Sequence, residues 1–285
     1  MASPERPDGA HLSPRSERVR KVAALSGRSV RAKQNAFRVE GPQAVRSLLE
    51  AAPAHALEVF LTSEADAAHP ELSALAREAG APRHEVSGEV IAHMVREQGH
   101  SSVANPQGVI AVARPVDRPW RQVLDALPAE GPLTVVVCER LQDPGNAGLV
   151  LRTADAAGAD AVFFGEDSAD IYSPKVVRSS VGSLMHVSVA RKVPVGPLLA
   201  ELSRRGIRTA ATSPRAATDL FQWSVPERLA WVVGNEARGL TEDTLAACDE
   251  RVRIPLFGRA ESLNLATAAT LCLFESARAH RAVNP

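Results

Sequence analysis

The chain has 285 residues, 33 Lys+Arg against 33 Asp+Glu, and 45% hydrophobic residues. This length and composition predict one large domain or two smaller ones and exclude a chain that is disordered throughout. No stretch approaches the roughly 20 uninterrupted apolar residues of a membrane span, and the first residues lack the apolar core of a signal peptide, so we expect a cytoplasmic protein with no membrane partner.

The N-terminal region is locally basic although the net charge is zero. Between His11 and Arg38, eight basic residues accompany one acid, Glu17. This density suits binding to phosphates, and it equally suits a solvated arm. Residues 1–15 carry Pro, Ser, Gly and charge without periodicity, so we expect them to form a disordered basic and polar arm.

Residues 16–113 predict a small α/β domain. A short β-like run, Phe37–Gly41, leads into a helix with Val45, Leu48 and Leu49 on one face. Strands are expected within 57–64 and 108–116, and helices within 69–80 and 87–97. Prolines at four positions then punctuate residues 114–132, which we interpret as a linker with a short helix near Val123–Leu127.

Residues 133–285 alternate more regularly between short apolar runs and helical stretches. Continuous apolar runs predict strands that are buried on both faces, as in a parallel sheet with helices on each side. The expected strands are Leu133–Cys138, Ala161–Phe164, His186–Val189, Ile207–Ala211, Leu229–Val233 and Val252–Ile254. The expected helices are Asn146–Ala157, Lys175–Val181, Pro197–Arg205, Glu242–Ala247 and Leu263–Arg281.

Ligand chemistry in such sheets occurs beyond the carboxyl ends of the strands. After Cys138, Asp143-Pro144-Gly145 forms a turn, and Asn146 is a plausible N-cap of the next helix. Arg152 follows Asn146 by six residues, roughly 9 Å along a helix axis, so both side chains could reach one phosphate or ribose. Taken alone, Asn146 is more often only a cap and Arg152 only a surface charge.

Two further segments carry similar polar residues. In VGNEARGL, Gly234 permits close approach of the backbone to a ligand, Asn235 and Glu236 follow it, and Gly239 closes the loop. An ordinary glycine turn has the same pattern. In RIPLFGRAESLN, Ile254-Pro255 ends a strand, Ser262 is a plausible cap of the last helix and Asn264 falls in its first turn.

The three segments together resemble the SpoU/TrmH class of SPOUT ribose 2′-O-methyltransferases, over about Leu133–His280. The chain has neither G-x-G-x-x-G after the first strand nor a P-loop. The resemblance implies a C-terminal trefoil knot, and S-adenosylmethionine held at Gly234, Ile254, Leu263 and, less directly, Thr212. The stretch YSPKVVRSSVGSL also resembles this class, and places Arg178 and Ser180 near the RNA.

The resemblance further implies a homodimer with the active site at the subunit interface. Asn146, Glu236, Ser262 and Asn264 would position the ribose and phosphate. Members of the class are often assigned a general-base arginine at the position of Arg152. A guanidinium loses its proton only in an unusual environment, so the alternative is that Arg152 holds the 3′-phosphate and acts through its charge. The sequence leaves both roles open.

The N-terminal half more weakly resembles the substrate-binding domain that precedes the catalytic domain in many of these enzymes. In its basic stretch we expect Arg28, Arg31 and Lys33 to contact RNA. This layout favours 23S ribosomal RNA over transfer RNA as the substrate. Cys138, Cys248 and Cys272 lie far apart and form no cluster with histidine, so we expect no metal.

Three alternatives remain at this stage. The chain could be a transfer RNA ribose methyltransferase, a non-catalytic RNA-binding homologue with the same fold, or an α/β enzyme that uses a nucleotide cofactor on a small molecule. The missing glycine fingerprint and the basic stretch count against the last.

Overall fold

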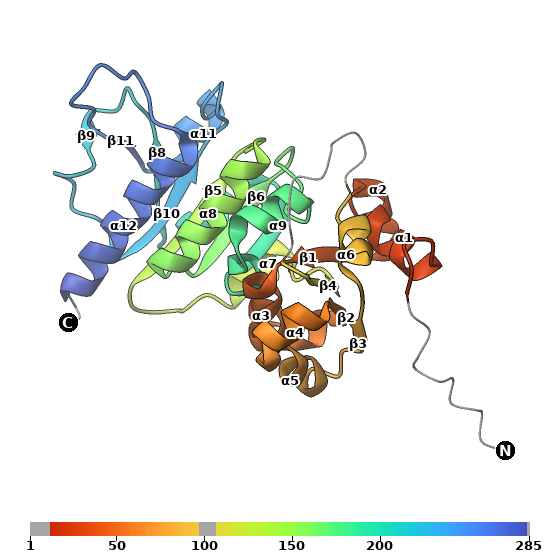
Figure 1. The fold of residues 1–285 in the computed structure, drawn as a ribbon. Coiled ribbons are helices and arrows are strands. Elements are labelled where there is room, and N and C mark those ends of the chain that lie inside the picture. Colours follow the sequence, from red (N-terminus) through yellow and green to blue (C-terminus); the bar gives the residue numbers. More distant parts are fainter. Residues whose placement is uncertain (1–11, 97–106, 284–285) are drawn as a thin grey trace. The chain divides into compact units, whose positions relative to one another are not determined.

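The computed structural model describes residues 12–96 and 107–283. The chain divides into two compact units, Met1–Pro115 and Val116–Pro285. Figure 1 shows the elements of each unit along the chain. Of the basic and polar arm expected over residues 1–15, positions 1–11 lie outside the described residues.

The N-terminal unit is built around a four-stranded sheet of order β1-β4-β2-β3. β1 and β2 each pair antiparallel with β4, and β3 runs parallel to β2. The strands are β1 (Phe37–Glu40), β2 (Ala56–Leu61), β3 (Arg83–Glu85) and β4 (Val109–Ala113). The helices are α1 (Glu17–Ala24), α2 (Arg28–Gln34), α3 (Pro42–Ala51), η1 (Pro53–His55), α4 (Ser63–Ala68), α5 (Pro70–Glu78) and α6 (Gly88–Met94).

Two residues of the basic stretch are buried in this unit. Arg31 is 7% exposed, and its guanidinium donates to the carbonyl oxygens of Leu25 at 2.7 Å and Ser26 at 2.6 Å. Arg38 is 1% exposed and forms an ion pair with Glu40 at 2.7 Å. These two charges stabilise the unit's own backbone and core, so the exposed basic surface is smaller than the sequence count suggests.

The C-terminal unit contains a seven-stranded sheet of order β7-β6-β5-β10-β8-β11-β9. Every pairing in it is parallel, as the continuous apolar runs predict. The strands are β5 (Leu133–Cys138), β6 (Ala161–Gly165), β7 (Ser188–Val193), β8 (Arg208–Thr212), β9 (Thr218–Asp219), β10 (Arg228–Val233) and β11 (Glu250–Arg253). The helices are α7 (Trp120–Asp125), α8 (Pro144–Ala157), α9 (Pro174–Ser180), η2 (Ser183–Met185), α10 (Val195–Arg204), α11 (Glu242–Ala247) and α12 (Leu265–Val283).

Helices cover both faces of this sheet. On one face α8 packs against α9 and α12 (Figure 1). Gly148 permits the α8–α9 approach, because a Cβ there would lie 1.9 Å from Oγ of Ser179 and 2.6 Å from the carbonyl oxygen of Val176. On the α12 side, the indole of the fully buried Trp231 donates to Oγ of Ser276 at 2.8 Å.

The opposite face holds a core cluster that includes Val135, Val137, Phe163 and Leu198. Val123 and Leu124 of α7 belong to the same cluster. The segment expected to be a linker, residues 114–132, therefore contains a helix that packs in the core of the C-terminal unit. The sequence predicts the short helix, but the prolines on both sides of it indicate a linker and give no sign that Val123 and Leu124 pack in a core.

Candidate active site

The polar loops of the three motifs meet at the carboxyl edge of the large sheet. Val233, the last residue of β10, is in register with Cys138, the last residue of β5. β8 pairs with β10 on one side and with β11 on the other. Because parallel strands end at the same edge, the loops that follow β5, β8, β10 and β11 lie close together.

A chain of side-chain hydrogen bonds joins one residue from each motif. Nδ2 of Asn264 donates to Oδ1 of Asn146 at 3.0 Å, and Nδ2 of Asn146 donates to Oε1 of Glu236 at 3.2 Å. The Glu236 carboxylate also accepts the backbone N–H groups of Asp143 at 3.0 Å and Gln142 at 3.2 Å. Residues almost 120 positions apart in sequence are thus fixed relative to one another.

These contacts determine the ionisation of Glu236. Partial burial by itself raises the pKa of this carboxyl group, but hydrogen bonds from backbone N–H groups and from Asn146 outweigh it, so the pKa is lower than its ordinary value. Glu236 is therefore a carboxylate at neutral pH, acting as the acceptor that holds the β5–α8 loop.

The helix caps differ from the sequence expectation. Asp143, not Asn146, caps α8: its Oδ1 accepts the N–H of Asn146 at 2.8 Å, and Pro144 occupies the first helical turn. Asn264, not Ser262, stands before α12, and its Oδ1 accepts the N–H of Ala266 at 2.9 Å. Asn146 is therefore inside its helix, where its side chain is available to the other two motifs.

The conformation of the loop after β10 leaves no room for a side chain at Gly234. A Cβ at this position would lie 2.3 Å from the carbonyl carbon of Gly239 and 2.4 Å from the nitrogen of Leu240. Asn235 and Gly239 exchange backbone hydrogen bonds at 2.9 Å, which closes the loop over Gly234. The sequence predicted that Gly234 lets the backbone approach a ligand closely. In the structure, the absence of a side chain at Gly234 lets the backbone of Gly239 and Leu240 approach it closely.

A cavity of about 520 Å³ lies at this edge of the sheet. All four residues expected to hold the methyl donor line it: Thr212, Gly234, Ile254 and Leu263. Its remaining lining residues combine apolar side chains with the polar residues of two motifs. They include Val233, Val252, Leu256, Leu265 and Ala268, together with Asn235, Glu236, Glu261, Ser262 and Asn264.

Asn235 and Glu261 are among the lining residues that were not chosen from the sequence. The sequence assigned no role to Asn235. In the structure, Nδ2 of Asn235 donates to the carbonyl oxygen of Arg140 at 2.9 Å and thereby joins the loop after β10 to the loop after β5. Glu261 immediately precedes Ser262, and its exposed carboxylate borders the cavity. The position of Glu261, directly before the S-L-N motif, was the one feature of the sequence that could have indicated a place at the site.

Arg152 lies on the solvent-exposed side of α8 and does not line the cavity. It is six residues beyond Asn146 in the same helix, so the two are separated by roughly 9 Å along the axis. Near it, the hydroxyls of Thr153 and Thr270 lie 3.1 Å apart and join α8 to α12. The structure thus places Arg152 on an exposed part of α8, outside the lining of the cavity, where a substrate can reach it from solvent.

The residues expected to contact RNA fall into two groups. Arg28 and Lys33 are exposed on α2, and Arg178 is half-buried on α9. Arg31 is buried as described above, and Ser180 is fully buried with its hydroxyl donating to the carbonyl oxygen of Val177 at 2.9 Å. Sequence gave no indication of this burial, and the structure does not favour direct RNA contacts by Arg31 and Ser180.

Within residues 12–96 and 107–283, no group of three or more His, Cys, Asp and Glu side chains is arranged to hold a metal ion. Over the same residues, no helix combines the length and apolar character needed to cross a membrane.

A parallel sheet with a loop-lined cavity at its carboxyl edge defines an α/β protein that binds a small ligand there. Two family models match the chain: the SpoU rRNA Methylase family over residues 133–274, and an MRM3-like substrate binding domain over residues 16–111.

Individual relatives agree with these matches. The 23S rRNA (guanosine-2′-O-)-methyltransferase RlmB of Bordetella pertussis is 33% identical over 84% of this chain and 95% of its own. An uncharacterized tRNA/rRNA methyltransferase of Synechocystis sp. is 36% identical over 68% of this chain and 66% of its own. The crystal structure of the SpoU methyltransferase AviRb from Streptomyces viridochromogenes, in complex with AdoMet, is 29% identical, with a TM-score of 0.75 over 95% of this chain and 99% of its own. The chain belongs to the SpoU rRNA methylase family.

Proposed function

We propose that this protein methylates a ribose 2′-hydroxyl of 23S ribosomal RNA, using S-adenosylmethionine as the methyl donor. The observation that carries the proposal is that two of the motifs line one cavity at the carboxyl edge of the sheet, and the third is hydrogen-bonded to both of them there. Residues following three different strands line it together, and Asn264, Asn146 and Glu236 form a hydrogen-bonded chain beside it. The names of the relatives support the reaction and the RNA.

The cavity fits the proposed donor in size and in the character of its walls. Its volume of about 520 Å³ is within the range of small-molecule sites, and apolar side chains alternate with backbone and a few polar groups. Gly234, Ile254 and Leu263 would hold the adenosine part, and the Glu261 carboxylate would lie near a positively charged donor. Bound S-adenosylmethionine would supply an electrophilic methyl group.

Arg152 is the residue assigned to the acceptor side. On the exposed face of α8 its guanidinium can hold the phosphate next to the target ribose, and its charge would stabilise the oxygen as the hydroxyl proton passes to solvent and the oxygen takes the methyl group, with S-adenosylhomocysteine as the leaving group. The alternative role, general base, requires a guanidinium that has lost its proton, and arginine as a residue type keeps its proton at neutral pH. We therefore assign Arg152 as a phosphate clamp with an electrostatic role.

We also propose that the protein acts as a cytoplasmic homodimer. Large apolar side chains are exposed on helices of the C-terminal unit and next to its cavity: Leu149 is 39% exposed, Phe274 is 48% exposed and Phe257 is 89% exposed. Exposed apolar groups of this size are typical of surfaces that another protein covers. A second copy on the α8 and α12 side would also enclose Arg152. The trefoil knot stays part of this proposal, inferred from the family.

The N-terminal unit is proposed to bind the RNA. It matches a substrate binding domain, and α2 presents Arg28 and Lys33 to solvent. With few aromatic side chains in the whole chain, 4%, recognition would depend on RNA shape and backbone.

The test is to map ribose methylation in ribosomal and transfer RNA from cells with and without this protein. Loss of one 2′-O-methyl group from 23S RNA is the expected result. Loss from transfer RNA instead would reassign the substrate. An unchanged methylation map, together with no binding of S-adenosylmethionine by calorimetry, would indicate a non-catalytic RNA-binding homologue.

A further inference from the structure

One buried residue outside the donor cavity, Glu139, contacts both ends of the loop that lines it, through its backbone N–H at one end and its carboxylate at the other. We call residues 234–240 the donor loop, since Gly234, Asn235, Glu236 and Gly239 all line the cavity. Glu139 follows the last residue of β5, and its backbone N–H donates to the carbonyl oxygen of Val233 at 2.8 Å. This contact fixes the start of the donor loop.

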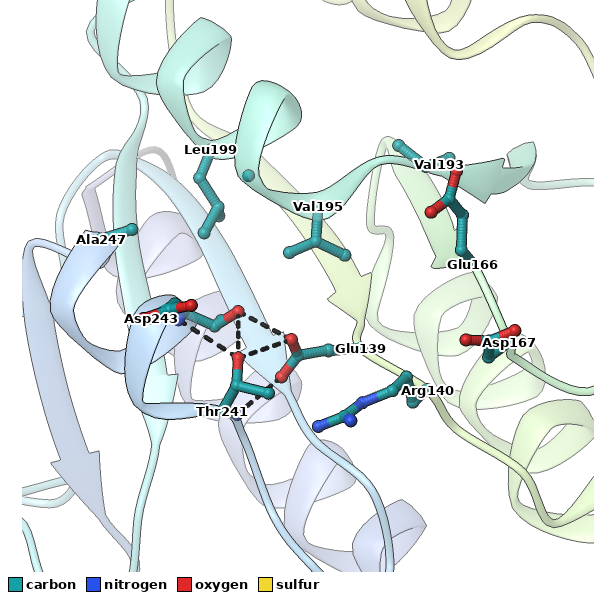
Figure 2. A pocket seen from close by; sticks show the side chains of 12 residues that line it. Glu139, Arg140, Glu166, Asp167, Val193, Val195, Leu199, Thr241, Asp243 and Ala247 are labelled. Atoms are coloured by element: carbon teal, nitrogen blue, oxygen red, sulfur yellow. Dashed lines mark hydrogen bonds between the residues drawn. The ribbon is translucent and has the colours of Figure 1, made fainter.

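The side chain of the same residue fixes the end of the donor loop. The Glu139 carboxylate accepts the N–H of Thr241 at 2.9 Å and the hydroxyls of Thr241 and Thr244 at 2.8 Å each. Figure 2 shows these contacts converging on the carboxylate. Thr241 is also the N-cap of α11, so the first turn of that helix is fastened to β5 together with the loop.

Glu139 is 7% exposed, and its carboxylate is contacted by hydrogen-bond donors of Thr241 and Thr244. Burying a carboxylate costs free energy, which three donors directed at it offset. If the carboxylate is removed, the N–H of Thr241 and the hydroxyl of Thr244 lose their acceptor, and the hydroxyl of Thr241 keeps only the hydroxyl oxygen of Thr244, 2.9 Å away. Beside them lies a second cavity of about 390 Å³, lined by Glu139, Thr241 and Thr244, which would admit water to those donors (Figure 2).

A shift at Thr241 would reach the donor cavity through the backbone. The carbonyl of Gly239 and the nitrogen of Leu240 already occupy the space beside Gly234, at 2.3–2.6 Å from where a Cβ would be. Thr241 follows directly after these atoms. Movement of the loop end therefore changes the wall formed by Gly234 and Asn235. Neither Glu139 nor Thr241 lines the donor cavity, so their effect on the donor is indirect.

We propose that Glu139 is a positioning residue for methyl-donor binding, which sets the shape of the donor loop through Thr241 and Thr244. This inference rests on the proposed function, because it takes the cavity at Gly234 as the S-adenosylmethionine site.

The test compares Glu139→Ala with Glu139→Gln and with Glu166→Gln as the matched control. Glu166 is an exposed carboxylate on the wall of the second cavity, and its side chain has no hydrogen bond to the donor loop among the described residues. For each folded variant, the dissociation constant of S-adenosylmethionine is measured by calorimetry, and KM for the donor and kcat are measured by RNA methylation.

Glu139→Ala is expected to weaken donor binding about tenfold or more. The KM for the donor should rise by more than kcat falls, because the donor loop and not the reacting atoms is disturbed. Glu139→Gln keeps one carbonyl acceptor for the N–H of Thr241 and should recover part of the affinity. Glu166→Gln should bind as the unmodified protein does.

A lower unfolding temperature with unchanged donor affinity would overturn the proposal, because it would show a merely structural role for Glu139. If Glu139→Ala does not fold, Glu139→Gln and Thr244→Val are measured instead. Thr244→Val removes one of the hydroxyls that donate to the carboxylate. Unchanged donor affinity in both variants would refute the proposal. If the unmodified protein itself does not bind S-adenosylmethionine, the proposed function fails, which is a different result.

Discussion

Substitution of Gly234 by alanine gives the sharpest test of the donor cavity, because the expected movement follows from the spacing of backbone atoms around this glycine. An added Cβ would meet three backbone atoms: the carbonyl carbon of Gly239 at 2.3 Å, the nitrogen of Leu240 at 2.4 Å and the oxygen of Gly239 at 2.6 Å. Restoring ordinary contacts of about 3.4 Å requires a backbone shift of about 1 Å. No side-chain rotation can relieve the overlap, since all three atoms belong to the backbone.

The shift acts on both stability and binding. Overpacking of this kind costs about 1–3 kcal/mol of unfolding free energy. The same movement displaces Asn235 and Gly239, which line the cavity, so donor affinity should fall by about tenfold or more. Urea unfolding measures the first effect and calorimetry with S-adenosylmethionine measures the second.

Gly258→Ala is the matched control. A Cβ at Gly258 would meet nothing within 4 Å, and this glycine does not line the cavity. We expect its stability and donor affinity to equal those of the unmodified protein. If Gly234→Ala also behaved like the unmodified protein, the donor loop would not have the tight conformation described here, and the argument for a donor site at Gly234 would fail.

Three further predictions concern the residues around the cavity. Arg152→Ala should abolish methylation while leaving donor affinity nearly unchanged, and Arg152→Lys should retain part of the activity if charge is what matters; full methylation by Arg152→Ala would remove this residue from the mechanism. Asn146→Ala breaks the link between Asn264 and Glu236 and should lower the unfolding free energy by about 1–3 kcal/mol in urea; no measurable loss would show that the link does not couple the loops. The pKa of Glu236 is lowered in the folded protein, so its stabilising contribution is present above its ordinary value of 4.5 and is lost as the pH falls through the lower folded value. Unfolding measured from about pH 6 to pH 3 should therefore show a smaller loss of stability for Glu236→Gln than for the unmodified protein, and parallel curves would contradict this.

Local sequence patterns predicted the large sheet well and the caps poorly. The run Leu133–Cys138 matches β5 residue for residue, because a strand buried on both faces needs apolar side chains at every position. The cap of α8 was predicted at Asn146, but Asp143 and Pro144 start the helix three residues earlier. Several residues in that turn are acceptable caps, and the path of the preceding loop decides among them.

Burial explains two further differences between sequence and structure, at Arg31 and Ser180. Arg31 reads as a surface charge in a basic stretch, yet it is directed at carbonyl oxygens of its own chain. Ser180 reads as a polar residue near RNA, yet its hydroxyl is bonded within its own helix. A residue type does not reveal which side of a short helix packs inward when polar and apolar residues are mixed along it.

By itself, the sequence determined the class of fold and six of the seven strands of the large sheet, because these depend on local apolar runs, and motifs of fixed spacing supplied the candidate site residues; the two-residue strand β9 has no such run. Only the tertiary structure decided that Asn146, Glu236 and Asn264 bond to one another and that Glu139 holds both ends of the donor loop. Those contacts join residues about 90–120 positions apart. Such contacts form only when parallel strands end at one edge of a sheet and bring their loops together.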